Sequence, residues 1–250
     1  SPPVSHQAPA GSPNVVLVTV DTLRSDHIGA WGADGVKTPH IDAIAASGVR
    51  FARAMAPIAV TGPSHAAILS GAGPWSTQML LNGVDVPEQT PLLSENLQTA
   101  GYRTGAFVSA YVLDRSLGFG RGFEVYDSQF GRLRGFSDTR MGRLVAALDR
   151  VMDPHLILER RADQTVDRAI DWLETVDDQP FFVWVHLFDP HGPYAPPSPW
   201  DQAYYSGDPF DQSHTSMDSV SGVAPYLQDS LSGIRDLDWV KAQYAGEVSF

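Results

Sequence analysis

A hydroxyl group and an imidazole stand four residues apart at what reads as the start of a short helix. Thr61 and His65 lie in the stretch Val60–Gly71, Val-Thr-Gly-Pro-Ser-His-Ala-Ala-Ile-Leu-Ser-Gly. Pro63 suits the first turn of a helix and Gly71 can end it, so Thr61 is expected just ahead of the helix N-terminus. Backbone N–H groups and the helix dipole favour an anion there, beside a hydroxyl nucleophile. The alternative is an ordinary threonine or serine cap on a short buried helix.

Carboxylates and a second imidazole follow two predicted strands. Asn14–Val20 and Phe181–Leu187 are apolar runs of strand length, as expected for parallel strands that are buried on both faces. Asp21 follows the first run, and Asp189 and His191 follow the second. Ligands of open α/β sheets bind beyond the carboxyl ends of the strands, so Asp21 is a candidate hard-metal ligand. The second loop could bind a metal, an anion or a proton. A turn aspartate and a proline-stiffened loop in water are the alternatives.

Helices and strands alternate between these motifs. Helices are predicted at Thr38–Gly48, Thr90–Gly101, Arg160–Val176 and from Val240 to Phe250, and further strands at Val49–Ala54 and Arg103–Ser109. We expect Ile41 and Ile44 on the inner face of the first helix, and His186 as a hydrogen-bonded core histidine. The predicted fold class is α/β, with a mixed, mostly parallel central sheet sandwiched by helices. Because the last helix has no stop signal, we expect the C-terminal part of the fold to be missing from this chain.

The domain organisation follows from composition. Residues 1–13 contain four prolines with Ser, Ala and Gly and read as a flexible tether, which suggests an exported protein. Residues 14–250 read as one domain. Two stretches without a clear period, 110–158 and 192–232, are expected to be loop or lid insertions.

Charge and cysteine content exclude several classes of function. The chain has 250 residues and a formal net charge of −12, so general affinity for nucleic acid is not expected. It has no cysteine, which excludes disulfides and thiolate metal sites within it. No apolar run is long enough for a transmembrane segment. The sequence does not indicate the oligomeric state.

Four segments together resemble the sulfatase branch of the alkaline phosphatase superfamily. They are Asn14–Gly32, Thr38–Phe51, Thr61–Gly71 and His186–Pro197, the last reading His-Leu-Phe-Asp-Pro-His-Gly-Pro-Tyr-Ala-Pro-Pro. Each is moderately specific, and their order and spacing make the resemblance strong over nearly the whole chain after the tether. The resemblance implies an N-terminal part of a metal-dependent hydrolase.

The resemblance also implies a role for each candidate residue. Asp21 matches the first metal ligand, and Thr61 falls at the nucleophile position, which is also a metal ligand. His65 stands where these enzymes have Arg. His191 and Asp189 match the loop near the ester oxygens and the leaving group. We therefore expect Thr61, His65 and His191 to be catalytic, Asp189 and Ser64 to bind substrate, and Asp21 and Thr61 to bind the metal.

The sequence departs from the family pattern at the nucleophile. True sulfatases carry a Cys or Ser matured to formylglycine, and Thr61 has an extra methyl on Cβ, so no formylglycine is expected. The family's Gly-Lys-Trp-His stretch would fall near Val108–Tyr111, where neither Lys nor His is present, and its later Asp-His metal pair would come after Phe250. Calcium or magnesium fits the sulfatase pattern, and zinc or manganese fits the phosphodiesterase pattern.

These residues predict hydrolysis of a small anionic sulfate or phosphate ester by a Thr61 nucleophile. One alternative is a phosphodiesterase or phosphomonoesterase of the same superfamily, for which a plain threonine is typical. An alternative of another class is a non-catalytic anion-binding pseudoenzyme, because the aldehyde precursor is missing.

Overall fold

A computed structural model describes residues 8–9, 11–130 and 159–250. The chain forms two compact units, each built from two stretches. Unit 1 comprises Ser1–Val20 and Met55–Phe188, and unit 2 comprises Asp21–Ala54 and Asp189–Phe250. The chain therefore passes from unit 1 to unit 2 at the ends of two strands, and each unit is described by itself.

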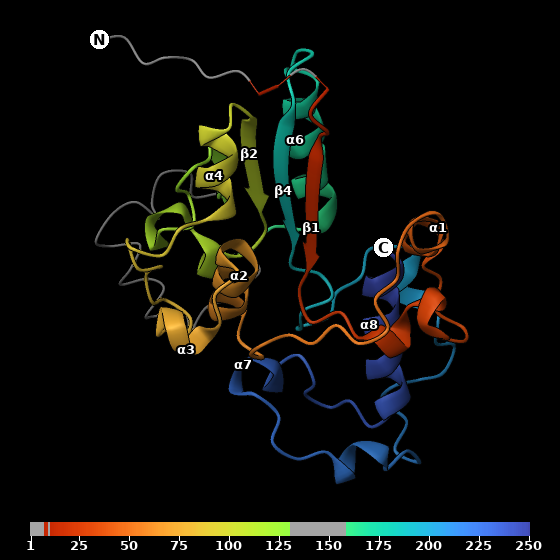
Figure 1. Ribbon diagram of the computed structural model, residues 1–250. Coiled ribbons are helices and arrows are strands. Elements are labelled where there is room, and N and C mark those ends of the chain that lie inside the picture. Colours follow the sequence, from red (N-terminus) through yellow and green to blue (C-terminus); the bar gives the residue numbers. More distant parts are fainter. Residues whose placement is uncertain (1–7, 10, 131–158) are drawn as a thin grey trace. The chain divides into compact units, whose positions relative to one another are not determined.

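Unit 1 contains a four-stranded parallel sheet (Figure 1). The strands are β1 Val15–Val20, β2 Arg103–Val108, β3 Val125–Asp127 and β4 Phe181–Leu187, in the order β1-β4-β2-β3. The last residue of β1, Val20, is paired with Leu187 of β4. The carboxyl ends of these neighbouring strands therefore lie at one edge of the sheet. The predicted α/β fold class is confirmed.

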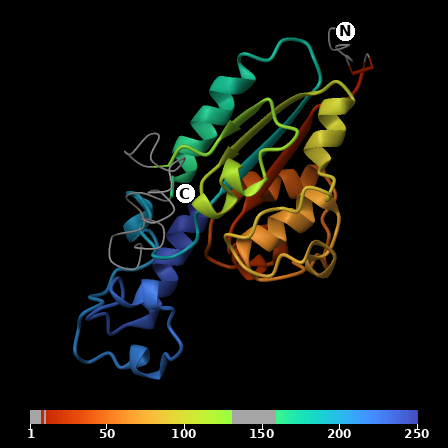
Figure 2. The same cartoon turned by 90° about the vertical axis from the view of Figure 1, so that its left-hand side faces the viewer.

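Helices cover both faces of this sheet, as Figure 2 shows. The helices of unit 1 are α2 Thr61–Ser70, α3 Pro74–Thr77, α4 Leu93–Thr99 and α6 Ala162–Leu173, with 3-10 turns at Tyr111–Leu113 and Arg115–Leu117. Phe182 and Trp184 of β4 pack in the core on the side of α2 and α4. Val183 and Val185 alternate with them and pack in the core that α6 covers. This alternation explains why β4 is apolar at successive positions.

The edge strand β1 is less buried than its sequence predicts. Val16 and Val18 are 58% and 52% exposed. They alternate with Val15 and Leu17, which pack towards the α2 side. Helix α6 packs against β2 and β4 and leaves this face of β1 uncovered by described residues of unit 1.

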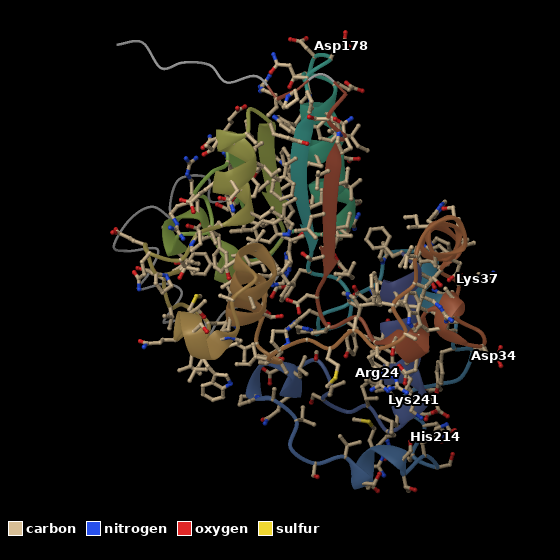
Figure 3. All side chains as sticks on the ribbon, viewed as in Figure 1. Arg24, Asp34, Lys37, Asp178, His214 and Lys241 are labelled. Carbon is tan, nitrogen blue, oxygen red and sulfur yellow. The ribbon has the colours of Figure 1, made fainter. Side chains whose placement is uncertain are left out.

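Unit 2 is built around one long helix. Its helices are α1 Pro39–Ser47, α7 Pro225–Gln228 and α8 Leu237–Ser249, with 3-10 turns at Ser25–His27, Gly29–Trp31, Trp200–Gln202 and Ser216–Ser219. Asp236 caps α8 by accepting the Asp238 N–H, and His214 lies 3.6 Å from the same cap carboxylate. Lys241, on the exposed side of α8, pairs with Asp238 (Figure 3).

Several local predictions are wrong, because the presence or absence of a tertiary partner decided the structure. Val49–Ala54 forms no strand, and Val49 is 81% exposed. Ile44 is 72% exposed, so the predicted inner stripe of α1 does not face a core of described residues. Val125–Asp127, predicted as loop, is β3 and pairs with β2 through three residues only. That pairing is too short for a period-2 signal.

The structure does not describe residues 1–7, 10 and 131–158. Most of the predicted tether, 1–13, and of the first predicted insertion, 110–158, therefore lies outside the described residues. In 192–232 the described chain forms turns, two 3-10 turns and the one-turn helix α7. No helix in the described part of the chain has the length and apolar character needed to cross a bilayer.

Candidate active site

The predicted nucleophile occupies the first position of α2. Thr61 is half-buried there, and the preceding Val60 is extended, at φ −139° and ψ 126°. Gly71 ends the helix in the left-handed region, at φ +69°, and its N–H donates to the Ala67 carbonyl. The sequence placed Thr61 one residue earlier, ahead of the helix. Its hydroxyl therefore stands on a rigid element, where the dipole of a ten-residue helix favours an anion.

A chain of hydrogen bonds leads from the core to Thr61. The indole N–H of buried Trp184 donates to Thr19 Oγ1 at 3.0 Å, and His65 Nε2 lies 3.0 Å from the same oxygen. His65 Nδ1 lies 2.8 Å from the Thr61 carbonyl oxygen. A carbonyl only accepts, so Nδ1 carries a proton, and in the neutral ring Nε2 accepts from the Thr19 hydroxyl. We call these four residues the Trp184–Thr61 hydrogen-bond chain.

The Trp184–Thr61 hydrogen-bond chain holds the ring of His65 in place. Its ring is 5% exposed, and both nitrogens have partners in unit 1. Both contacts hold the ring against the first turn of α2 and the end of β1.

The first turn of α2 also offers fewer N–H donors than its sequence suggests. Pro63 has none, and the Gly62 N–H donates to Asn82 Oδ1 at 2.8 Å. Asn82 is exposed, and because its oxygen accepts this bond, its NH₂ group is left as a donor beside Thr61's helix. Sequence reasoning missed this residue, since Asn82-Gly83 signals only a turn. Ser64 follows Pro63 in α2. Within the described residues its hydroxyl makes no hydrogen bond.

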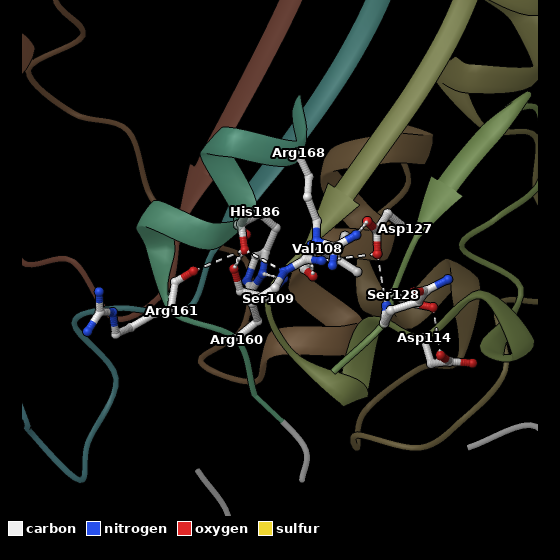
Figure 4. Close-up of polar contacts among 11 residues, drawn as sticks. Val108, Ser109, Asp114, Asp127, Ser128, Arg160, Arg161, Arg168 and His186 are labelled. Carbon is white, nitrogen blue, oxygen red and sulfur yellow. Dashed lines mark hydrogen bonds and ion pairs between the residues drawn. The ribbon is translucent and has the colours of Figure 1, made fainter. Parts of the chain in front are cut away.

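Buried polar groups hold the carboxyl ends of β2, β3 and β4 together (Figure 4). Arg160 donates to Asp127 Oδ1 and to the Val108 carbonyl, both at 3.0 Å, and to Thr165 Oγ1 at 2.9 Å. Ser109 Oγ lies 2.7 Å from that threonine oxygen and donates to the His186 carbonyl at 2.8 Å. Burial lowers the pKa of Arg160, and Asp127 opposes this effect.

His186 joins this cluster to the nucleophile helix. It is fully buried, and the Ser109 N–H points to its Nδ1 at 3.4 Å, which confirms the predicted hydrogen-bonded core histidine. Its ring packs edge-on against that of His65, with the centroids 4.8 Å apart. The end of β4 and the start of α2 are thus held against each other within unit 1.

In unit 2, Asp21 precedes a strained residue. Thr22 has φ +50°, and a β-branched residue is a clear outlier in the left-handed region. The buried Tyr244 of α8 holds this turn, because its O–H donates to the Thr22 carbonyl at 2.8 Å and its oxygen accepts the Arg24 N–H at 2.9 Å. Burial raises the pKa of Tyr244, which keeps the donating proton in place. Strain of this kind is concentrated at functional sites.

The loop after β4 carries the other candidates. His191 Nδ1 lies 2.7 Å from the Gly192 carbonyl oxygen, so this nitrogen carries a proton and directs Nε2 to the opposite side of the ring. The ring stacks on Tyr226, with centroids 5.9 Å apart and planes 19° apart. Tyr194, three residues on, packs edge-on against Tyr244. Tyr244 therefore contacts the segments that follow both Asp21 and Asp189.

The described residues do not assemble a complete metal site. Among them, no group of three or more His, Asp or Glu side chains could hold a metal ion. Asp21 and Asp189 follow the neighbouring strands β1 and β4, and carboxylates suit a hard cation such as Ca²⁺ or Mg²⁺. A full set of six to eight oxygen ligands for Ca²⁺ would require more donors than these two.

The predicted site residues fall into two groups. Unit 1 holds Thr61, Ser64 and His65, and unit 2 holds Asp21, Asp189 and His191. The structure adds Thr19, Asn82 and Tyr244 as residues that hold or flank them; none has a local sequence signal.

Known proteins resemble this chain in sequence and in fold. The chain is 35% identical over 101 residues to an ulvan-active sulfatase of Formosa agariphila, a match that covers 40% of this chain and 20% of that enzyme. It is 26% identical over 187 residues to an N-acetylglucosamine-6-O-sulfatase of Bacteroides thetaiotaomicron, covering 74% of this chain and 32% of the enzyme.

The fold resembles that of the phosphonate monoester hydrolase of Agrobacterium radiobacter, with a TM-score of 0.65 and 20% identity over 95% of this chain and 56% of that one. The matched region thus spans between a fifth and a third of these curated relatives. A profile described as sulfatase matches residues 13–243. By this match, together with the fold and the four sequence segments, the chain belongs to the sulfatase family of the alkaline phosphatase superfamily.

Proposed function

We propose that the protein containing this chain hydrolyses sulfate or phosphate esters, with the Thr61 hydroxyl as nucleophile. The observation that carries the proposal is the placement of Thr61 at the N-terminus of α2, with its backbone fixed by a hydrogen-bond chain from the core. A nucleophile held in this way is preorganised for attack. The named relatives are sulfatases, and a structure of similar fold is a phosphonate monoester hydrolase, so both ester classes remain candidates.

The proposed reaction has two steps. Thr61 Oγ forms a bond to sulfur or phosphorus while the bond to the leaving oxygen breaks, and the hydroxyl proton passes to solvent. His191 carries a proton on Nε2 and donates it to the leaving oxygen, which departs as an alcohol. Water then attacks the sulfur or phosphorus of the threonyl ester, and His191 Nε2 accepts a proton from this water. The bond to Thr61 Oγ breaks, and Thr61 Oγ takes up a proton from solvent. The hydrogen bond from Nδ1 to the Gly192 carbonyl supports this assignment, because it keeps a proton on Nδ1 and orients the ring.

Other residues would bind and orient the ester. The dipole of α2, the Asn82 amide and the Ser64 hydroxyl are proposed to bind its non-bridging oxygens. Asp189 is proposed to lie on the leaving-group side with His191. His65 is proposed as a positioning residue that fixes the Thr61 carbonyl.

A substrate screen tests the reaction class. The full-length protein is assayed with an aryl sulfate, a phosphomonoester and a phosphodiester, with each of Ca²⁺, Mg²⁺, Mn²⁺ and Zn²⁺. Turnover of one class identifies the ester. Binding of sulfate or phosphate without any turnover would contradict the proposal and favour a non-catalytic anion-binding protein.

Metal dependence is a separate proposal, with Asp21 as the ligand that this chain supplies. We expect chelation to abolish turnover and added Ca²⁺ or Mg²⁺ to restore it. Asp21→Asn should raise the metal concentration for half-maximal activity about tenfold or more, the scale on which even outer-shell changes act. Asp26→Asn, which alters an exposed carboxylate paired with Arg24, is the matched control and should not change it. Turnover that is unaffected by a chelator would contradict metal dependence.

The Trp184–Thr61 hydrogen-bond chain predicts that Thr19→Val lowers kcat more than it changes KM. The methyl fills the space of the hydroxyl but leaves Trp184 Nε1 and His65 Nε2 without this partner. We expect kcat to fall about tenfold to a hundredfold, because small displacements of a reacting group are costly. Thr19→Ser keeps a hydroxyl and should restore kcat.

The control for that variant is Thr104→Val. This substitution removes another buried hydroxyl, which accepts the Glu124 N–H at 3.0 Å and, among the described residues, makes no hydrogen bond to the Trp184–Thr61 chain. It should lower stability and leave kcat unchanged. Equal loss of kcat in both variants would show that the effect of Thr19 is only structural.

A further inference from the structure

One asparagine of this chain is followed by glycine. The sequence has three asparagines, and Asn82 precedes Gly83, whereas Asn14 and Asn96 precede valine and leucine. The backbone nitrogen that follows an asparagine can attack the carbon of its side-chain amide, and a side chain on that following residue hinders the attack. Glycine has no side chain and moves freely in φ and ψ. Asn82 is therefore the asparagine whose sequence most favours loss of its amide.

The structure leaves the attacking nitrogen accessible. Asn82 and Gly83 are both exposed and form the turn that follows α3. Gly83 has φ +79°, and beyond its chain neighbours no atom lies within 4 Å of the Cβ position that it lacks. Among the residues that the structure describes, the Gly83 N–H donates no hydrogen bond. No contact would have to break before this nitrogen reacts.

The amide oxygen of Asn82 is held at the start of α2. The N–H of Gly62, the second residue of this helix, donates to Asn82 Oδ1 at 2.8 Å. A Cβ at Gly62 would lie 3.2 Å from this oxygen, so the close approach depends on the missing side chain. When the Gly83 nitrogen attacks Cγ, negative charge develops on Oδ1. A backbone N–H aimed at that oxygen stabilises the charge, as the donors of an oxyanion hole do.

The same contact favours the product. An aspartate formed from Asn82 would accept the Gly62 N–H in a charge-assisted hydrogen bond, which is stronger than the bond to a neutral amide. Negative charge near the N-terminus of a helix is also stabilising. The fold therefore favours both the transition state and the product of amide loss at this position.

We propose that Asn82 is a site of spontaneous deamidation that the Gly62 N–H promotes. The Gly83 nitrogen forms a bond to Asn82 Cγ and gives its proton to water. The bond from Cγ to the side-chain nitrogen breaks, and this nitrogen takes up a proton and leaves as ammonia. Water then opens the cyclic succinimide at either carbonyl, which gives aspartate or isoaspartate. One water is consumed and one ammonia released, with no change of oxidation state.

Deamidation would also change the proposed ester site. It replaces the Asn82 NH₂ donor by a carboxylate beside the start of α2, and a carboxylate repels an anionic ester. This consequence rests on the proposed function, whereas the deamidation itself does not. We expect Asn82→Asp to raise KM for the ester about tenfold or more, the scale of one lost hydrogen bond to a charged group, and to change kcat less.

Mass spectrometry of peptides tests the modification. The full-length protein is incubated at mildly alkaline pH, and the gain of one mass unit is followed at each asparagine. Asn82 should convert at least about tenfold faster than Asn14 and Asn96, which are exposed in the same molecule, because its nucleophile is unhindered and its oxygen is oriented. Equal rates at the three positions would overturn the proposal.

A peptide spanning residues 78–88 measures the rate without the fold. Asn82 should convert in the folded protein at least as fast as in this peptide. Slower conversion in the folded protein would show that the Gly62 hydrogen bond protects the amide, and would overturn the promoting role.

The kinetic variants separate the modification from the reaction. Asn82→Ser removes the NH₂ donor without adding charge and should raise KM less than Asn82→Asp. Asn82→Asp should unfold at no lower temperature than the unmodified protein, because its carboxylate faces a helix N-terminus. An unchanged KM in Asn82→Asp would overturn the effect on ester binding. Rapid conversion of Asn82 in a protein that hydrolyses no ester would overturn the proposed function and keep the modification site.

Discussion

Thr61→Ala should lower turnover by about 10⁴-fold or more while leaving the fold intact, because removal of a covalent nucleophile has effects of this size. Thr61 is half-buried at the first position of α2. The hydrogen bond from His65 goes to the Thr61 backbone carbonyl and survives the substitution. The measurement is kcat for the ester found in the substrate screen, with thermal unfolding followed by circular dichroism.

Thr61→Ser is the control that keeps the hydroxyl and removes only the methyl group. It should retain most of the turnover, which separates nucleophile chemistry from packing. In a His191→Ala background, and with an ester whose leaving group departs without protonation, the threonyl ester should accumulate and add the mass of a sulfate or phosphate to the peptide containing Thr61. Undiminished hydrolysis by Thr61→Ala would exclude Thr61 as the nucleophile.

Arg160→Met should lower the free energy of unfolding by about 3–5 kcal/mol, the cost of breaking a buried ion pair from one side. The Arg160 side chain is 3% exposed and Asp127 13% exposed. The substitution removes three hydrogen bonds and leaves the Asp127 carboxylate, the Val108 carbonyl and the Thr165 hydroxyl short of a donor. Urea denaturation measures the loss.

Arg168→Met is the matched control, because Arg168 pairs with the other oxygen of the same carboxylate at 3.1 Å but is 38% exposed. Solvent screens such a pair, and we expect a loss of about 1 kcal/mol or less. Similar losses for both arginines would show that burial does not decide the strength of this network. A kcat that falls with Arg160→Met at a temperature where the variant is folded would link the strand ends to the chemistry.

The sequence predicts the elements that carry the candidate site. The runs before Asp21 and Asp189 are β1 and β4, and they are parallel neighbours. The proline and glycine of Val60–Gly71 bound α2, because both act through local backbone geometry. The helix predicted from the apolar period of Arg160–Val176 is α6, Ala162–Leu173. These features depend on residues close in sequence, and a single sequence contains that information.

Strand pairing and surface coverage depend on the tertiary structure. Val125–Asp127 becomes β3 because β2 lies beside it, and Val49–Ala54 forms no strand because no described strand pairs with it. The exposure of Val16 and Ile44 follows from which helices cover which faces. The identity of an apolar residue does not show whether another helix or strand packs against it.

For the candidate site, the sequence determined the chemical groups and the strand and helix ends on which they stand: Thr61, His65, Asp21 and His191. Only the tertiary structure decided how those groups are held. Thr19 lies 46 residues from His65, Asn82 lies 20 from Gly62, and Tyr244 lies 222 from Thr22. Hydrogen bonds across such separations form only after the chain has folded, and one of them places the His65 ring beside Thr19.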